Sequence, residues 1–364
     1  MLFRSGVALP GSQLQPRSLT PNDAKTPTVQ QWTFSIEQQL TPGMALTVGY
    51  VGSHGYHFLE SGDMNPTASV FCSSTLKNCP AGLADGTKYY PVGTKSLNPA
   101  IGSATSWVSA VSTSYNALQV DLKQRFTKGL MFRANYTWSH TLDDGSQIGS
   151  SLFTNCASYI LDVFNIKKDW GDSCYDMPQR FSISGGYDLP FGQGKTFFSG
   201  VNGAADKLLG GWKLIGILSV QTGIPFGPNV GFNVSRNGAH TIPDRPSVNP
   251  NFSGPVIVGT PDKWFNSQAY ILPTAGTYGD LGRNALRGPA LRDLDLSFVK
   301  DTRLKERLNM EFRAEFFNLL NHTNFGIPAR SLFTSSGAYV ASAGVITNTV
   351  TTSRQIQLGL KLIF

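Results

Sequence analysis

Two histidines early in the chain are the first candidates for metal ligands. His54 and His57 lie in the run SHGYH, and imidazole nitrogen is a common ligand of Zn²⁺. A zinc site needs at least three protein ligands, and the run itself holds no third one. The spacing therefore predicts a position at the rim of a loop rather than a metal centre.

Two further runs contain residue types that bind cations or phosphates in other proteins. Asp143, Asp144 and Gly145 match the start of a calcium loop, but the later ligand positions of such a loop are absent. The run GQGK at 192–195 lacks the full phosphate-loop spacing and precedes no predicted helix. Both runs predict turns. No spacing ties serine, histidine and aspartate into a catalytic triad, so we expect neither an enzyme nor a bound cofactor or metal.

The four cysteines are the remaining residues with distinctive chemistry. An even count allows two disulfides in three connectivities, which suits an oxidising compartment. The pairs Cys72–Cys79 and Cys156–Cys174 each lie within one long predicted loop, where a local disulfide would rigidify that loop. Four unpaired thiols are the alternative.

Composition limits the classes of protein that these residues can belong to. Charged residues are 15% of the 364 residues, below the quarter or so that is usual in soluble domains. The net charge of +7 is scattered along the chain without a nucleic-acid module, so we expect no nucleic-acid partner. No apolar run is long enough for a membrane-spanning helix, and the N-terminus has no convincing signal-peptide core.

The elements that must position any site are predicted to be strands. The last stretch, 354–364, places Ile356, Leu358, Leu360 and Leu362 on one face and mostly polar residues on the other. Such period-two alternation is typical of a strand with one apolar face. Residues 1–27 are predicted to be loop, and residues 28–364 hold nine strands at about 29–40, 44–52, 115–126, 130–141, 179–189, 208–222, 291–300, 307–320 and 354–364.

Strand length and loop length together indicate a membrane barrel. The predicted strands are about 9–14 residues long, and tilted strands need about 9–11 residues to cross a bilayer. Short and long connections alternate strictly, as do the periplasmic turns and extracellular loops of outer-membrane barrels. Aromatic side chains agree, with Tyr50 and Trp138 expected near the long-loop rim and Phe126, Phe132 and Trp212 near the short-turn rim. We therefore predict an antiparallel, up-and-down, transmembrane β-barrel in the outer membrane, in contact with its lipid.

The polar faces of these strands are predicted to line the barrel lumen. If the turn after 291–300 is symmetric about Leu304, Asp295 lies opposite Arg313 and Asp293 lies opposite Glu315. Ten charged residues are expected to face the lumen: Asp121, Lys123, Arg133, Arg180, Asp293, Asp295, Glu311, Arg313, Glu315 and Lys361.

Several runs resemble one known family. VQQWTFSIEQQL, YNALQVDLKQRFTKGLMFRANYTWSHTLDDGS, GRNALRGPALRDLDLSFVKDTRL and RQIQLGLKLIF are similar to the C-terminal barrel half of Oar-like, TonB-dependent outer-membrane receptors of the acidobacterial type. The resemblance covers about residues 25–364. It implies a parent barrel of roughly 22 strands, an N-terminal plug, and a role for Phe364 in the signal that the barrel-assembly machinery recognises.

Against that family pattern, this sequence has no plug and only nine predicted strands. We expect a fragment that forms an open partial barrel, with its first and last strands as edges. The intact parent is expected to import a bulky, unidentified solute with energy delivered through TonB. The alternative is a non-transport barrel whose long extracellular loops bind a partner, as an adhesin or surface scaffold does. A soluble all-β enzyme fits poorly, because it would need a core packed on both faces of its sheets.

Overall fold

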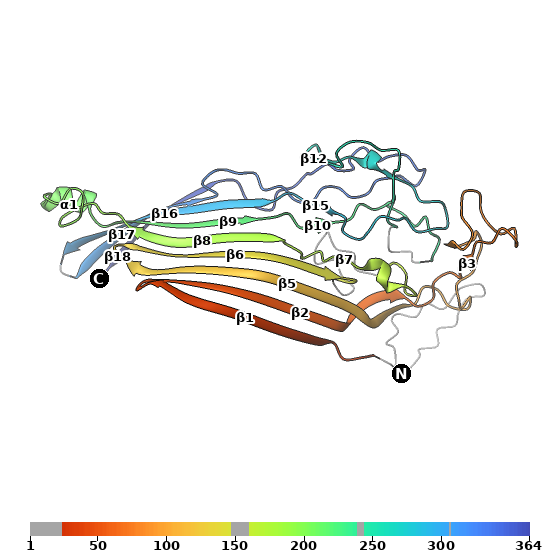
Figure 1. Ribbon diagram of the computed structural model, residues 1–364. Coiled ribbons are helices and arrows are strands. Elements are labelled where there is room, and N and C mark those ends of the chain that lie inside the picture. Colours follow the sequence, from red (N-terminus) through yellow and green to blue (C-terminus); the bar gives the residue numbers. More distant parts are fainter. Residues whose placement is uncertain (1–23, 147–159, 239–243, 306) are drawn as a thin grey trace, which may run out of the picture.

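One long antiparallel sheet organises the molecule (Figure 1). The computed structural model describes residues 24–146, 160–238, 244–305 and 307–364. Over these residues nine long strands neighbour one another in the order β1-β2-β5-β6-β8-β9-β16-β17-β18, and the two-residue strand β7 (Gly171–Asp172) pairs with β6. Their bounds are β1 Thr28–Thr41, β2 Met44–Asp63, β5 Thr105–Thr127, β6 Leu130–Asp143, β8 Gln179–Asp188, β9 Trp212–Gln221, β16 Leu291–Lys305, β17 Leu308–Phe317 and β18 Gln355–Ile363.

Connections at the two ends of the sheet differ in length, as predicted. Tight turns join β1 to β2, β5 to β6 and β16 to β17 at one end, and the connection from β8 to β9 at that end carries the short helix α1 (Gly203–Leu209). At the turn after β5, Lys128 and Gly129 have φ of 50° and 83°, which is the backbone twist that a two-residue hairpin loop prefers. The long connections gather at the opposite end (Figure 1).

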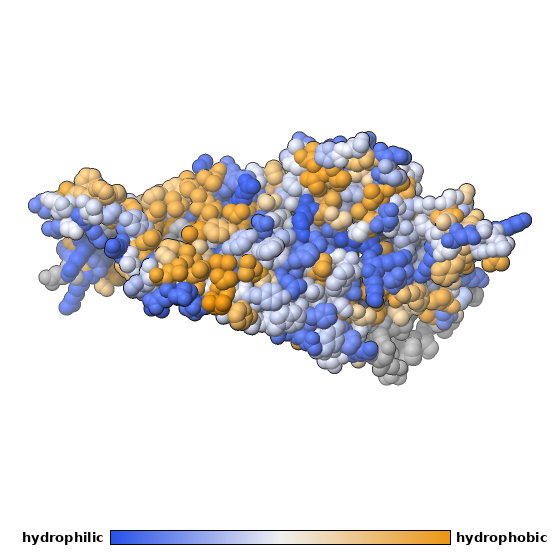
Figure 2. Space-filling view, viewed as in Figure 1, coloured by the Kyte–Doolittle hydropathy of each residue, from blue (hydrophilic) through white to orange (hydrophobic). Residues whose placement is uncertain are grey.

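The two faces of the sheet have opposite character, because strand pairing aligns mostly apolar residues with one another on one face and polar residues on the other. We call a set of residues paired across neighbouring strands a row. One row across seven strands reads Ile36, Val48, Val120, Tyr136, Phe181, Val220 and Arg292, and the next row, on the other face, reads Glu37, Thr47, Asp121, Asn135, Ser182, Ser219 and Asp293. Apolar side chains on the first face are exposed, as Phe34 at 67% and Leu358 at 68% illustrate. Figure 2 shows part of this apolar surface over the strands.

Two strands extend far beyond their predicted ends. β2 continues to Asp63 instead of ending near residue 52, and β5 begins at Thr105 instead of near residue 115. The two extensions pair with each other through irregularities near Phe58. Near its end β2 is buried on both faces, since the successive residues Glu60 and Ser61 are each 1% exposed, and the one-sided alternation that marks a strand in the sequence is lost there. Tyr50 consequently lies within β2 and not at its end.

One predicted strand begins too early. Residues 208–211 were expected to open the sixth strand, but Leu208 and Leu209 end α1, and β9 begins at Trp212. Gly211 has a φ of 73°, a left-handed conformation that glycine adopts readily and that separates the helix from the strand. No helix among the described residues has the length and apolar character needed to span a membrane.

The long connections pack into a compact assembly at one end of the sheet, which we call the loop cap (the described residues of 58–111, 144–178, 222–290 and 318–354). It holds four two-stranded sheets, β3 (Val70–Phe71) with β4 (Lys88–Tyr89), β10 (Pro225–Phe226) with β15 (Leu286–Arg287), β11 (Ser247–Val248) with β14 (Tyr270–Ile271), and β12 (Ile257–Thr260) with β13 (Lys263–Phe265). It also holds the 3₁₀ turns Ile166–Asp169 and Ser267–Ala269. Its core is apolar, with Phe226, Phe265 and Leu332 each 0% exposed.

The sheet is open. Its order ends with β1 on one side and β18 on the other, and among the described residues these two strands do not pair with each other. An open sheet of nine such strands agrees with the predicted partial barrel. Of the predicted N-terminal loop, residues 1–23 lie outside the described residues, and residues 24–27 have no regular structure.

Candidate functional site

The polar face of the sheet carries all ten charged residues that were predicted to face a lumen. The strand register places them on one face, although they do not form a single cluster. Arg133 Nε lies 2.6 Å from Asp121 Oδ2, and Arg313 Nε lies 2.7 Å from Glu311 Oε1. Both pairs are partly exposed, so each contributes at most about 1 kcal/mol to stability. Their effect is on the charge pattern of this face.

The predicted pairing between β16 and β17 is wrong by four residues. Arg313 lies opposite Val299 and Glu315 lies opposite Ser297, while Asp295 accepts a hydrogen bond from the backbone amide of Asn318 at 2.8 Å. The last pair of the hairpin is Lys305 with Leu308, so the chain reverses two positions later than a turn centred on Leu304 requires. A shift of this size keeps every residue on its predicted face, because it is an even number of residues.

A hollow of about 420 Å³ lies on the polar face around Asp121 and Arg133. Hydroxyl and amide side chains from four neighbouring strands line it: Thr33, Ser35, Thr47, Gln119, Asn135 and Thr137. Gly49 deepens the hollow because it places no side chain between Ser35 and Gln119. This size lies within the range of small-molecule pockets. The lining offers hydrogen-bond donors, acceptors and one ion pair to a polar solute.

Ion pairs, one of them fully buried, hold the loop cap together and fasten it to β6. Arg283 donates from its guanidinium to Asp143 at the end of β6 and, through Nε, to the carbonyl oxygen of Asp169 at 2.6 Å. The side chains of Arg283 and Asp143 are each 6% exposed. A second arginine, Arg287, donates to the carboxylates of both Asp172 and Asp176. The two arginines thereby join the 222–290 connection to the 144–178 connection.

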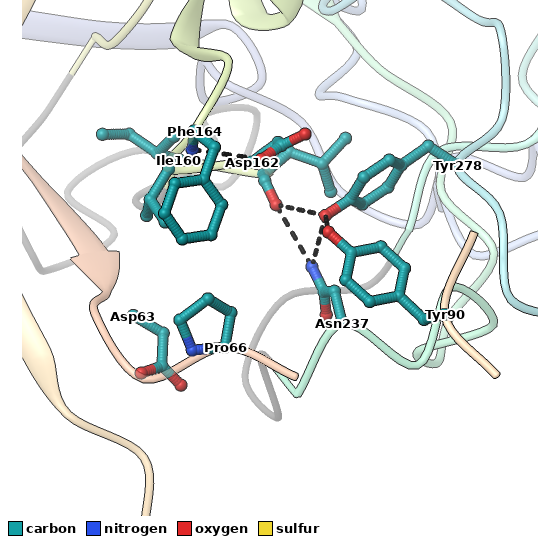
Figure 3. Close-up of a pocket in the computed structure, with 10 residues that line it drawn as sticks. Asp63, Pro66, Tyr90, Ile160, Asp162, Phe164, Asn237 and Tyr278 are labelled. Carbon is teal, nitrogen blue, oxygen red and sulfur yellow. Dashed lines mark hydrogen bonds between the residues drawn. The ribbon is translucent and has the colours of Figure 1, made fainter. Parts of the chain in front are cut away.

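A small cluster centred on Tyr278 joins a third connection to these two (Figure 3). The hydroxyls of Tyr90 and Tyr278 lie 2.9 Å apart, and Asn237 Nδ2 donates to the Tyr278 hydroxyl at 3.1 Å. Lys88 Nζ lies 3.2 Å from Asp162 Oδ2, and Lys168 Nζ lies 4.5 Å from the centre of the Tyr278 ring. The cavity beside them measures about 10 Å³, the space for one water molecule at most. This cluster fastens the cap and leaves no room for a solute.

Burial dominates the protonation behaviour of the cap. It raises the pKa of Tyr278 and raises the pKa of Tyr270 to about 12. It also raises the pKa of Asp169, against the opposing effect of Arg245 at 3.2 Å, and lowers the pKa of Lys168. The charged groups of the cap therefore depend on their neighbours rather than on water for solvation.

Of the short runs that hinted at metal or phosphate binding, the two aspartates have structural roles, and the run at 192–195 forms the expected turn. Asp143 is paired with Arg283, and Asp144 accepts the amide of Ser112 at 2.7 Å. Within the described residues, the possible ligand groups do not include His54 or His57; they are Cys72–Cys79–Asp85 and His140–Asp172–Asp176. The first contains a disulfide, and in the second Arg287 already supplies the positive charge. Neither group fits a metal centre.

One of the two expected disulfides joins residues that the structure describes. Cys72 and Cys79 are bonded, with their Cα atoms 4.7 Å apart. Cys174 is also disulfide-bonded, while its expected partner, Cys156, lies outside the described residues. Phe364, expected to belong to an assembly signal, follows β18 at the short-turn end and is 91% exposed.

The arginines that hold the cap were not predicted from the sequence. Arg283 and Arg287 lie in the run GRNALRGPAL, which reads as an ordinary glycine- and proline-containing loop. Their spacing of four residues is a weak signal, and their acidic partners are more than 100 positions away in the sequence. Only the packing of three connections shows what the two arginines do.

Comparison with known proteins places this geometry in context. A family model described as an outer membrane beta barrel domain matches residues 3–357, and no curated protein matches the chain. Among solved structures, the outer membrane transporter YddB from Escherichia coli is similar, with 11% sequence identity and a TM-score of 0.42. That match covers 95% of this chain and 34% of the transporter, so the chain spans about a third of its length.

Proposed function

The chain belongs to the outer membrane beta barrel domain family, and from that premise we propose that it forms part of the wall of a TonB-dependent transporter of the Oar-like type. Its place is the cell outer membrane, where its apolar face meets lipid. In this proposal the intact protein imports a bulky solute with energy delivered through TonB. The role of the chain is transport and not catalysis.

The observation that carries this proposal is the opposite character of the two faces of one sheet. An exposed aliphatic and aromatic face is stable against hydrocarbon, whereas the other face needs water or polar partners. Ion pairs such as Arg133–Asp121 and the polar hollow around them lie on that second face. A polar solute moving along this face would exchange its hydrogen bonds to water for hydrogen bonds to Gln119, Asn135 and Thr137.

The TonB-dependent type rests on the resemblance of the sequence runs to that family. Energy from TonB reaches such receptors through a plug that the barrel surrounds. The apolar side chains of Ile215 and Ile217 lie on the polar face and are 42% and 50% exposed. We propose that this side of β9 contacts the plug, which would shield them from water.

Uptake by living cells tests the proposal. We expect deletion of the full-length gene to abolish uptake of one member of a panel of radiolabelled solutes above the porin size limit, and deletion of TonB or a protonophore to have the same effect. An Arg133→Gln variant should lower the rate of uptake while its amount in the outer membrane stays unchanged. Uptake that persists without TonB would contradict the TonB-dependent part, and no change for any solute would contradict transport.

The loop cap supports a second candidate function, binding of a partner at the cell surface. Its own core and its buried ion pairs give the long connections one fixed shape, which suits a scaffold or adhesin. This alternative predicts that Arg283→Ala weakens attachment of cells to a surface, whereas Arg133→Gln does not. Attachment that is unaffected by either variant would count against it.

A further inference from the structure

The connection from β8 to β9, which we call the rim loop (residues 189–211), differs from the other short-turn connections because it carries exposed apolar side chains. Phe197 and Phe198 are 54% and 55% exposed, and Leu208 and Leu209 are 72% and 38% exposed. All four belong to the connection between the end of β8 and the start of β9, which lies at the end of the molecule that bears α1 (Figure 1). Side chains of this kind at the end of a membrane strand are stable at the lipid interface and costly in water.

Hydrogen bonds hold the rim loop against the lipid-facing side of the sheet. Trp212 Nε1 donates to the carbonyl oxygen of Leu208 at 3.0 Å, and Lys300 Nζ donates to the carbonyl oxygen of Gly210. Trp212 pairs with Lys300. This pair lies on the same face of the sheet as the pair of Leu214 and Phe298, two residues further along the strands. The end of α1 is therefore fixed to the apolar face, and not to the polar one.

A cationic pocket of about 430 Å³ separates the rim loop from the end of β16. Its lining includes four cationic side chains and two acidic ones: Lys195, Lys207, Lys300, Arg303, Asp206 and Asp301. Both acids have partners, because Asp206 accepts the amide of Gln193 at 2.6 Å and Asp301 lies 2.9 Å from Lys213. Lys195 and Lys207 are exposed, so the pocket offers positive charge to an anion.

An apolar groove of about 340 Å³ lies on the lipid-facing side near this pocket. Gly185 and Gly216 face each other in the register, between Phe132 and Leu296, and leave a gap two strands wide. Aliphatic and aromatic side chains from the adjacent rows form its walls, among them Ile183, Tyr187, Leu214 and Leu218. Leu214 lies two residues from Trp212, or about 7 Å along the strand, so the groove runs toward the rim loop.

We propose that the rim loop and this groove together bind an anionic phospholipid of the membrane leaflet on the short-turn side. The phosphate lies at Lys195 and Lys207, and an acyl chain lies along Gly185 and Gly216. Charge complementarity selects the headgroup, since basic residues at a membrane surface attract anionic lipids. The aliphatic lining selects the chain. Neither feature is needed for the proposed import of a solute.

Titration with soluble short-chain lipids tests the proposal on the full chain in a zwitterionic detergent. Native mass spectrometry would compare dioctanoyl phosphatidylglycerol, dioctanoyl phosphatidylcholine and inorganic phosphate. We expect phosphatidylglycerol to bind at least tenfold more tightly than phosphatidylcholine. The double variant Lys195→Gln, Lys207→Gln should lose about fivefold in affinity for each charge removed. A double variant on two other turns of the same rim, Lys128→Gln with Lys305→Gln, should keep the affinity of the original chain.

The groove has its own matched pair of variants. A side chain at Gly216 would meet the Leu296 side chain at 3.3 Å and the carbonyl oxygen of Asp295 at 3.6 Å. One at Gly186 would project from the opposite face and meet its nearest neighbours, among them Ile215 and Met131, at an ordinary contact distance of 3.8 Å. Gly216→Leu should therefore abolish the preference for dioctanoyl over dibutanoyl phosphatidylglycerol, and Gly186→Leu should not. Equal affinity for the two headgroups, competition by inorganic phosphate alone, or the same losses in the control variants would overturn the proposal.

Discussion

The strand body and the loop cap use the same apolar residue types in opposite ways. In the strand body, which we define as the long strands outside the cap, Phe34 and Leu358 are more than two-thirds exposed. In the cap, Phe226 and Phe265 are fully buried in a core of their own. The difference follows from the solvent. In the outer membrane, hydrocarbon covers the apolar face of the body, whereas the cap lies beyond the membrane and must bury its apolar side chains in its own core.

The charged residues of the two regions also differ in how far their side chains are exposed. On the body, the side chains of Arg133 and Asp121 are 61% and 25% exposed, so water screens them. Where the cap joins β6, the side chains of Arg283 and Asp143 are both 6% exposed and have each other and backbone groups as their partners. Removing one partner should therefore affect the cap strongly and the body weakly.

The largest expected effect is that of Arg283→Ala. This change leaves the Asp143 carboxylate buried without its countercharge, which costs about 5 kcal/mol, near the upper end for a broken buried pair. Hydrogen exchange in peptides from 144–178 and 222–290 should become much faster. Arg133→Ala, the matched change on the body, should cost about 1 kcal/mol or less. Equal effects of the two changes would refute the contrast.

Phe265→Ala should have the next largest effect. Phe265 packs beside Phe226 and Tyr270, with ring centres 5.8 and 6.3 Å away, so truncation opens a cavity and costs about 4 kcal/mol. Phe34→Ala, on the lipid-facing side, should change stability by only about 0.5 kcal/mol. Urea unfolding in detergent, followed by cap and body peptides separately, measures both. Strong destabilisation by Phe34→Ala would mean that a protein surface, and not lipid, covers the apolar face.

An arginine on the last strand tests the two faces directly. Leu358→Arg places a charge on the lipid-facing side and should reduce the stability of the chain in phospholipid vesicles by about 3 kcal/mol. Gln357→Arg, on the adjacent residue, places the same charge on the polar face and should have little effect. Unfolding titrations of the two variants in the same vesicles give the comparison. The opposite order would reverse the assignment of the faces.

The smallest expected effect is a pH dependence confined to the cap. Burial raises the folded-state pKa of Asp169 and Asp244 above their ordinary value of 3.8. The folded cap therefore holds more protons than the unfolded chain above that value, and these two groups add stability as the pH falls from neutral toward 4. Asp244→Asn should flatten the dependence, measured as hydrogen exchange in peptides from 222–290 between pH 7.5 and pH 5. An unchanged slope would show that Asp244 contributes none of it.

The sequence predicted the strand body well because a local rule governs it. Alternation from Leu130 to Trp138 or from Ile356 to Leu362 requires only that one face meets lipid, and any register consistent with the turns preserves the faces. The register error between β16 and β17 shows the limit of that rule. Alternation fixed the faces of Asp295 and Arg313 but not their neighbours, because a shift by an even number of residues leaves the pattern unchanged.

The cap could not be predicted in the same way, because its interactions join residues far apart in the chain. Arg283 and Asp143 are separated by 140 positions, and nothing in the local sequence of either identifies the other. The extensions of β2 and β5 were missed for a related reason, since burial on both faces removed the alternation that marks a strand. Their pairing depends on loops that fold over them.

The sequence by itself determined which face of each strand is apolar, the alternation of short and long connections, and hence a barrel wall in the outer membrane. Those features depend on the character of successive residues, which the local chain contains. Tertiary structure alone decided the register of the last hairpin, the cap with its arginine ion pairs, and the cationic pocket beside the rim loop. Each of these requires groups from distant segments to meet, and their energies depend on burial, which exists only after the chain has folded.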